Sequence, residues 1–181
     1  MKKTSFKLVV LMMVMVFMTG ALAGCGGIGS NDIRIGVLNE MTGGNATFGT
    51  SAANGAKMAI KEANAKGGVL GKQIQGIYAD NKSEPSESAN AMTKLLTQDR
   101  VVAVTGIFSS SNAIAASSVA EANKVPFLAV GATNPKVTVD EKNGKVKENT
   151  FRICFIDPFQ GTVGANFVLD TLKLKSGKER V

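Results

Sequence analysis

The fold follows from the stretch Val101-Val102-Ala103-Val104-Thr105-Gly106-Ile107-Phe108-Ser109-Ser110-Ser111. Residues 101–107 are almost entirely apolar, which is typical of a strand that is buried on both faces of a parallel sheet. Three serines follow, and serine is a preferred residue at the start of a helix. The stretch therefore predicts a buried strand that leads directly into a helix, and we expect this helix to end near Asn123.

The same alternation of apolar runs and longer amphipathic segments continues on both sides of this stretch. Strands are predicted at residues 33–38, 73–80, 101–107, 125–130 and 151–156, and helices at 48–65, 85–98, 109–123 and 157–175. Strands that alternate with helices of this length indicate βαβ units. The sequence thus predicts an α/β fold with a doubly wound parallel sheet.

Two segments depart from this pattern. Residues 140–148 carry six charges around Asn143-Gly144, and this dipeptide between valines predicts a solvated hairpin. The second departure is at the end of the sequence, where Val181 comes just where a strand should follow the last predicted helix. We therefore expect residues 33–150 to form a first lobe, and residues 151–181 to form a crossover and the first helix of an incomplete second lobe.

The N-terminal residues have the features of a bacterial lipoprotein leader. Lysines at positions 2, 3 and 7 precede an uninterrupted apolar run at residues 8–18. This run is too short to span a bilayer, which takes about 20 residues, but it suits a signal peptide. Leu22-Ala23-Gly24-Cys25 then resembles a lipobox, so we expect a signal peptide at 1–24, a lipid on Cys25 and a flexible tether at 25–32. The alternative is an uncleaved signal anchor with an incidental cysteine.

Composition excludes several classes of function. The chain has 21 lysines and arginines, of which three lie in the leader. The rest of the chain therefore has 18 basic and 14 acidic residues, which gives it a net charge of +4. The basic residues are scattered and tryptophan is absent, which argues against nucleic-acid binding. The chain also has no histidine, which excludes Ser-His-Asp and Cys-His nucleophiles and histidine metal sites. We expect Cys154 to be a small buried apolar side chain, and we expect no metal and no cofactor.

Candidate ligand-binding residues follow two neighbouring predicted strands. Ser109-Ser110-Ser111 would place free amides and hydroxyls at a helix N-terminus, and Gly131-Ala132-Thr133-Asn134 would add open backbone groups and another hydroxyl. These residues can bind an anion, or they can simply cap a helix and form a turn. Asp80 near Glu84 and Glu87 is better explained as part of a solvated loop than as a calcium site.

Taken together, four segments resemble one known family. They are residues 33–38, 64–72, 106–111 and 151–161, the last reading Phe-Arg-Ile-Cys-Phe-Ile-Asp-Pro-Phe-Gln-Gly. These segments are similar to the branched-chain amino-acid-binding lipoproteins of ABC importers, which are type 1 periplasmic-binding proteins. The resemblance implies two α/β lobes around a cleft that closes on an amino acid.

The resemblance also assigns roles to residues. It implies that Ser109 and Thr133 hold the α-carboxylate of the ligand, with Ser110 beside them at the helix N-terminus. Gly131 and Ala132 would present backbone groups, and Phe48 would line the cleft unless it only packs on its own helix.

The function expected from this resemblance is capture of an amino acid, most simply a branched-chain one, for a membrane permease. The protein would be attached to the outside of the cell membrane through its lipid, and it would not be an enzyme. A sensor domain for an amide or another small carboxylate is the alternative binding function. A serine hydrolase that uses Ser109 is disfavoured, because no G-x-S-x-G motif and no obvious base accompany this serine.

The leader generates a first prediction. We expect Cys25→Ser to abolish metabolic labelling with a fatty acid and to release the protein from the membrane fraction, because two acyl chains are enough for stable attachment. Cys154→Ser is the control and should leave labelling unchanged. If the Cys25→Ser protein is still labelled and membrane-bound, the anchor is elsewhere.

Overall fold

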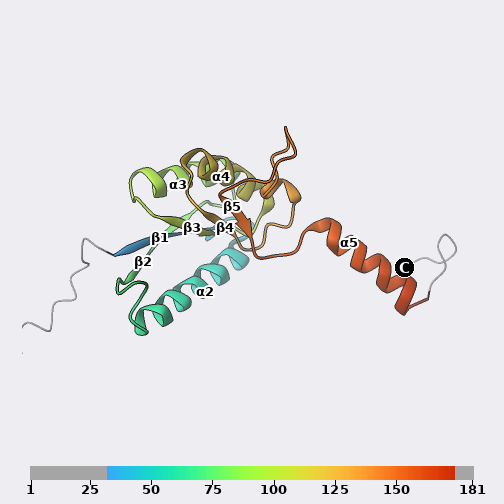
Figure 1. Cartoon of the computed structure of the whole chain (residues 1–181), viewed down its shortest axis with the longest axis horizontal. Helices are drawn as coiled ribbons and strands as arrows, with labels where there is room; N and C mark the ends of the chain where they lie inside the picture. Colours follow the sequence, from blue (N-terminus) through green and yellow to red (C-terminus); the bar gives the residue numbers. More distant parts are fainter. Residues whose placement is uncertain (1–31, 174–181) are drawn as a thin grey trace, which may run out of the picture. The chain divides into compact units, whose positions relative to one another are not determined.

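The computed structural model describes residues 32–173 and contains a five-stranded parallel sheet (Figure 1). The order of the strands is β2-β1-β3-β4-β5. They are Ile33–Asn39 (β1), Ile74–Asp80 (β2), Ala103–Gly106 (β3), Phe127–Ala129 (β4) and Thr150–Arg152 (β5). The predicted α/β class and parallel sheet are confirmed.

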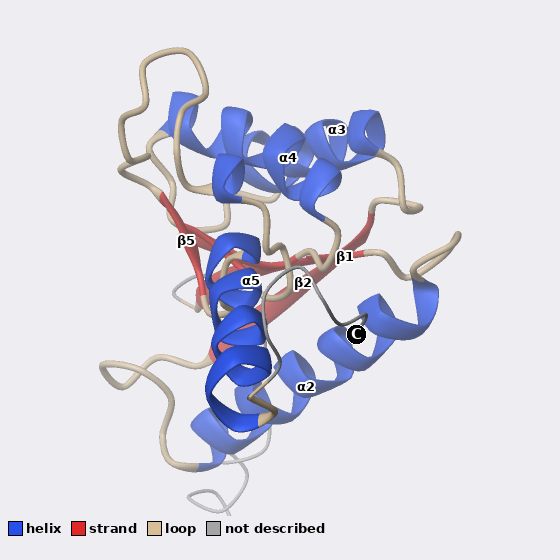
Figure 2. Ribbon diagram, turned by 90° about the vertical axis from the view of Figure 1, so that its right-hand side faces the viewer, coloured by secondary structure: helices blue, strands red, loops and turns tan. Residues whose placement is uncertain are grey.

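Helices cover both faces of this sheet, and a further helix follows the last strand. They are Ala46–Ala65 (α2), Pro85–Thr97 (α3), Ser110–Asn123 (α4) and Asp157–Asn166 (α5), with a 3-10 turn at Pro135–Val137 (η1) and a π-helical turn at Phe167–Thr171 (η2). Helix α2 lies on one face, and α3 and α4 lie side by side on the other (Figure 2). The sheet is therefore doubly wound, as predicted. Among the described residues, no helix is both long and apolar enough to cross a membrane.

The core lies between the sheet and the α3–α4 layer. Leu38, Met92 and Phe127 are completely buried there. Helix α4 contributes alanines instead of large side chains, and Ala113, Ala116 and Ala120 are all fully buried. Because these residues recur at three- and four-residue spacings, they form one narrow face that allows α4 to approach the strands closely.

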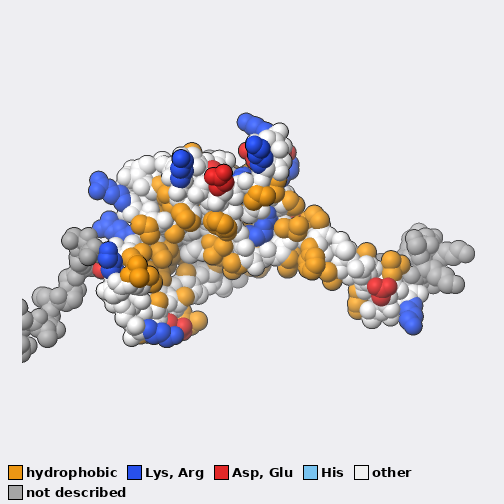
Figure 3. Space-filling model, in the orientation of Figure 1, with side chains coloured by type: hydrophobic (Ala, Val, Ile, Leu, Met, Phe, Trp, Pro, Cys, Tyr) orange, Lys and Arg blue, Asp and Glu red, His pale blue; other side chains and the backbone are white. Residues whose placement is uncertain are grey.

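Two predicted segments differ from the structure. The strand expected at 151–156 begins one residue earlier and is only three residues long, and the side chains of Ile153 and Phe155 after it are exposed. The last predicted helix forms, but its apolar face is not inward. No residue of α5 or η2 is buried, and the side chains of Phe159 and Phe167 are exposed. Apolar side chains are visible on this part of the surface (Figure 3).

Two carboxylates fix loops by accepting hydrogen bonds from backbone amides. Asp80 Oδ1, at the end of β2, accepts from Met41 N at 2.9 Å and from Thr42 N at 3.1 Å, which ties down the loop after β1. Glu121, near the end of α4, accepts from Asn149 N at 2.9 Å and from the Thr150 hydroxyl at 2.7 Å, which fixes the start of β5.

These two carboxylates generate a pH prediction. Burial raises the pKa of Asp80 and of Glu121, but the hydrogen bonds to each outweigh burial and hold the pKa below its ordinary value. The stabilisation is therefore complete above the unfolded pKa values of 3.8 and 4.5 and is lost as the pH falls through the lower folded values. We expect Asp80→Asn combined with Glu121→Gln to lower the Tm at neutral pH and to flatten its decline below about pH 4.5.

The control for this experiment is Glu62→Gln, at an exposed position on α2. Its Tm should follow that of the wild type across the pH range. A double variant that loses stability in acid as steeply as the wild type would show that other groups dominate the acid response.

A glycine in α2 generates a stability prediction. Gly55 lies in the interior of the helix, and a Cβ added there meets no atom within 4 Å. Gly55→Ala should raise the stability by about 0.5–1 kcal/mol, because alanine loses less backbone entropy in a helix. Gly106→Ala should have the opposite effect, since its φ is +130° and a Cβ would lie 2.0 Å from Leu38 O. Thermal unfolding measures both, and equal effects of the two substitutions would contradict this explanation.

Candidate functional site

The strand order puts a topological switch point between β1 and β3, and open α/β sheets have their ligand crevice at such a point. From β1 the chain passes to α2 on one face of the sheet, and from β3 it passes to α4 on the other face (Figure 1). In open α/β sheets, ligands bind outside the carboxyl ends of the strands at such a switch point. The predicted residues Ser109 and Thr133 follow β3 and β4 and lie at this edge of the sheet.

An aromatic pair stands at this edge. The rings of Phe48 and Phe108 are stacked, with centroids 4.4 Å apart and an interplanar angle of 4°. Phe108 also lies directly over Gly131, where an added Cβ would come within 2.2 Å of its ring. The predicted residues Phe48 and Gly131 therefore both lie against the ring of Phe108. Phe108 itself was not among the residues predicted from the sequence.

A buried carboxylate lies beneath this pair. Glu40, directly after β1, is completely buried, and its Oε2 accepts a hydrogen bond from Phe108 N at 2.9 Å. Its Oε1 accepts from Ser109 N at 3.0 Å and from the Asn112 side chain at 3.1 Å. Glu40 was not predicted either. In the sequence, Glu40 is only a polar residue that follows an apolar strand, and a solvated loop residue would look the same.

The turn that carries Phe108 is strained. Ile107 has a φ of 56°, in the left-handed region that β-branched residues rarely adopt. Its amide donates to Leu38 O at 2.8 Å and to Asn39 Oδ1 at 3.2 Å. Ile107 and Asn39 are both buried, so the end of β1 holds the strained turn in place.

The three serines have different environments. Ser109 is the N-cap of α4, and its hydroxyl oxygen lies 3.1 Å from that of Ser111 without capping the helix. The Ser110 hydroxyl oxygen accepts a hydrogen bond from Asn134 N at 3.2 Å, so it ties α4 to the loop after β4. The amides of Ser110 and Ser111 lie in the first helical turn, where the helix itself provides no acceptor.

The loop after β4 is fixed by an arginine that was not predicted to have a role. The Arg152 guanidinium, from β5, donates to Ala132 O and Asn134 O at 2.9 Å each and to Pro135 O at 3.1 Å. One backbone group of Ala132, its carbonyl, is therefore engaged by the protein.

Thr133 lies between these anchored residues. Its carbonyl accepts from Asp157 N, at the start of α5, at 3.2 Å, and its side chain is half-buried. In the described part of the chain, no protein group bonds to the Thr133 hydroxyl. The Thr133 hydroxyl, and the Ser109 hydroxyl with its neighbour at Ser111, are thus polar side-chain groups at this edge of the sheet.

The acidic residues near β2 do not form a metal site. Asp80 holds the loop after β1, and Glu87 pairs with Lys82 at 3.3 Å. Within residues 32–173, no three His, Cys, Asp or Glu residues are grouped so that they could hold a metal ion.

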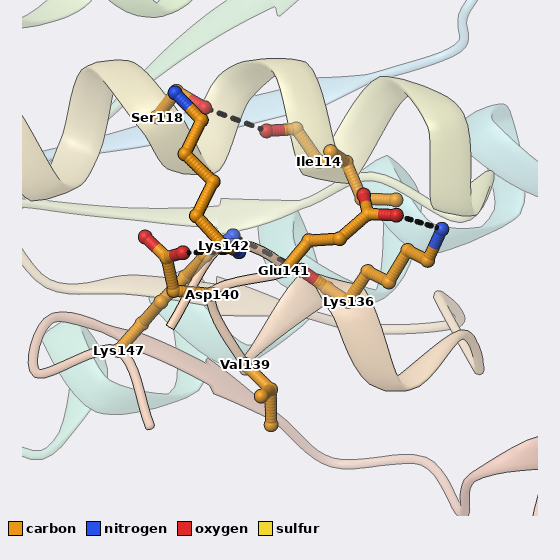
Figure 4. A pocket seen from close by; sticks show the side chains of 8 residues that line it. All are labelled: Ile114, Ser118, Lys136, Val139, Asp140, Glu141, Lys142 and Lys147. Carbon is orange, nitrogen blue, oxygen red and sulfur yellow. Dashed lines mark hydrogen bonds and ion pairs between the residues drawn. The ribbon is translucent and has the colours of Figure 1, made fainter. Parts of the chain in front are cut away.

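A cavity of about 230 Å³ lies elsewhere, between α4 and the hairpin at 139–146 (Figure 4). Its polar groups bond to one another. Lys147 Nζ donates to Ser117 Oγ at 2.7 Å and to two carbonyls of η1, and Lys136 pairs with Glu141. Burial lowers the pKa of Lys147, although Glu121 and Asp140 act in the opposite direction. The bonds around this cavity anchor the hairpin. None of the predicted ligand-binding residues lines the cavity.

The fold and the crevice define an α/β domain of the kind that binds small molecules at the carboxyl ends of its strands. Comparison with known proteins identifies its family, because residues 32–177 match the periplasmic binding protein family. The chain is 37% identical over 153 residues to Leu/Ile/Val-binding protein homolog 2 of Brucella abortus, which covers 84% of this chain and 40% of that protein.

Two solved structures are also similar. The branched-chain amino acid substrate binding protein LivJ from Streptococcus pneumoniae, solved with isoleucine, has 38% identity and a TM-score of 0.71, over 79% of this chain and 39% of that one. A solute binding protein from Rhodopseudomonas palustris, solved with 3,4-dihydroxybenzoic acid, has 27% identity and a TM-score of 0.60, over 69% of this chain and 32% of that one.

The chain therefore belongs to the periplasmic binding protein family, and the predicted family and its α/β fold are confirmed. It spans about two-fifths of the length of the curated relatives it matches.

Proposed function

We propose that this chain forms one wall of a solute-binding site that captures a branched-chain amino acid for an ABC importer. The observation that carries this proposal is the position of Ser109 and Thr133 at the carboxyl ends of adjacent strands, beside the Phe48–Phe108 pair. The isoleucine in the related structure from Streptococcus pneumoniae supports this class of ligand.

The two kinds of group in the site match the two ends of such a ligand. The Ser109 and Thr133 hydroxyls, with the first-turn amides of α4, can donate to the α-carboxylate. The stacked rings of Phe48 and Phe108 offer an exposed apolar surface to an aliphatic side chain. The amino acid would then be enclosed when a second wall closes over it, and the closed form would be recognised by a permease.

The remaining parts of the proposal concern location and chemistry. Family membership supports a place outside the cytoplasm, and we infer attachment through a lipid on Cys25. The protein binds without catalysis. Ser109 has no histidine to activate it, and both oxygens of nearby Glu40 already accept hydrogen bonds.

A plain carboxylate is the second candidate ligand, for import or for sensing. The related protein from Rhodopseudomonas palustris was solved with 3,4-dihydroxybenzoic acid, which has a carboxylate but no amino group. Titration with a panel of branched-chain amino acids, their amides and the matching carboxylic acids distinguishes these functions.

The site generates a binding prediction. In the mature protein expressed from its own gene, Ser109→Ala and Thr133→Ala should each weaken leucine or isoleucine binding by roughly ten- to a hundredfold. This range corresponds to ~1.5–3 kcal/mol for a hydrogen bond to a charged group. Affinity is measured by calorimetric titration, with thermal unfolding recorded in parallel so that a loss of fold is not mistaken for a loss of binding.

The control is Ser118→Ala on the same helix, since the Ser118 hydroxyl is exposed and donates to Ile114 O at 3.3 Å. Its affinity should equal that of the wild type. If the Ser109→Ala, Thr133→Ala double variant binds as tightly as the wild type, the ligand lies elsewhere and both residues are only cap and turn residues.

A further inference from the structure

We propose that Glu40 determines the specificity of this site by selecting a zwitterionic amino acid over a plain carboxylate. The inference rests on the proposed function, because it concerns the ligand that Ser109 and Thr133 hold. It starts from a charge that this binding scheme does not use. Glu40 is completely buried at the carboxyl end of β1, directly behind Ser109.

Glu40 occupies the donors that an anion would otherwise use. A helix N-terminus binds carboxylates through its free amides. At α4, the amides of Phe108 and Ser109 donate to Glu40 at 2.9 and 3.0 Å, and Asn112 donates at 3.1 Å. The protein thus supplies its own carboxylate here, and a ligand carboxylate has to use the hydroxyls and the remaining amides.

This arrangement places two negative charges close together when a carboxylate binds. Ser109 donates through its amide to Glu40, and in the proposed site it donates through its hydroxyl to the ligand. Like charges repel strongly where water is excluded. A zwitterion reduces this repulsion, because its ammonium lies one carbon from its carboxylate. A plain carboxylate meets the repulsion in full.

A structural role alone does not require this charge. The neighbouring Ile107 amide is held by two uncharged acceptors, Leu38 O at 2.8 Å and the side-chain carbonyl of Asn39 at 3.2 Å. A neutral acceptor is therefore sufficient to hold an amide at this end of β1. The carboxylate adds an electrostatic effect on whatever binds next to Ser109.

The test compares leucine with 4-methylpentanoate, which is leucine without its amino group. The affinities of both ligands are measured for the wild type and for Glu40→Gln, in the mature protein expressed from its own gene. The affinity for 4-methylpentanoate is measured by its competition with leucine. We expect Glu40→Gln to shift the preference toward 4-methylpentanoate by about tenfold or more. Any general loosening of Ser109 weakens both ligands and cancels in this ratio.

The matched control is Glu121→Gln. Glu121 also accepts hydrogen bonds from two backbone amides, and from two side-chain donors, but it lies near the other end of α4 and away from the site. Its preference ratio should stay within twofold of the wild type. The proposal is overturned if the ratio of the two affinities is the same in Glu40→Gln as in the wild type. It is also overturned if 4-methylpentanoate still fails to displace leucine from Glu40→Gln.

A second measurement separates this inference from the proposed function. Hydrogen exchange at the amides of Phe108 and Ser109 should accelerate in Glu40→Gln and not in Glu121→Gln, whether or not a ligand is present. If the wild type binds no amino acid, the proposed function fails, and exchange still tests whether Glu40 holds these amides. Unchanged exchange overturns the inference even where leucine binds.

Discussion

The structure depends on the pairing of β1 with a strand on each side. β1 pairs with β2 along its whole length and with β3 over its central part, and Val37 and Leu38 are completely buried. Because the chain leaves β1 and β3 toward opposite faces, both faces of the sheet are covered and a topological switch point lies where the two strands end. The place of the proposed ligand site is thus a consequence of the position of β1.

The strands and helices of this lobe could be predicted because their signals are local. The run at 101–107 and the serines after it correspond to β3, the Ser109 cap and α4, each within a few residues. The site was only partly predictable. Ser109 and Gly131 lie at strand ends, which periodicity locates, but Glu40 acts on amides 68 and 69 residues further along the chain. No local pattern distinguishes such a carboxylate from a solvated loop residue.

Helix α5 shows a different limit of prediction from sequence. The spacing of Val163, Phe167 and Leu172 correctly indicates a helix with one apolar face. Periodicity specifies that a face is apolar but not which surface covers it. In the described residues these side chains are about half exposed, so the described part of the chain does not cover this apolar face.

The polar contacts around the site organise it before a ligand arrives. Arg152 holds the loop after β4, the Ser110 hydroxyl ties this loop to α4, and Glu40 holds the start of α4 against β1. A ligand that meets loops already held in place does not have to order them, and this saving strengthens binding. The same bonds use up the carbonyl of Ala132 and the amide of Ser109, so the groups left for the ligand are few. The rigidity of the candidate site and the selectivity proposed for it therefore have one origin, which is the set of donors and acceptors that the protein has already engaged.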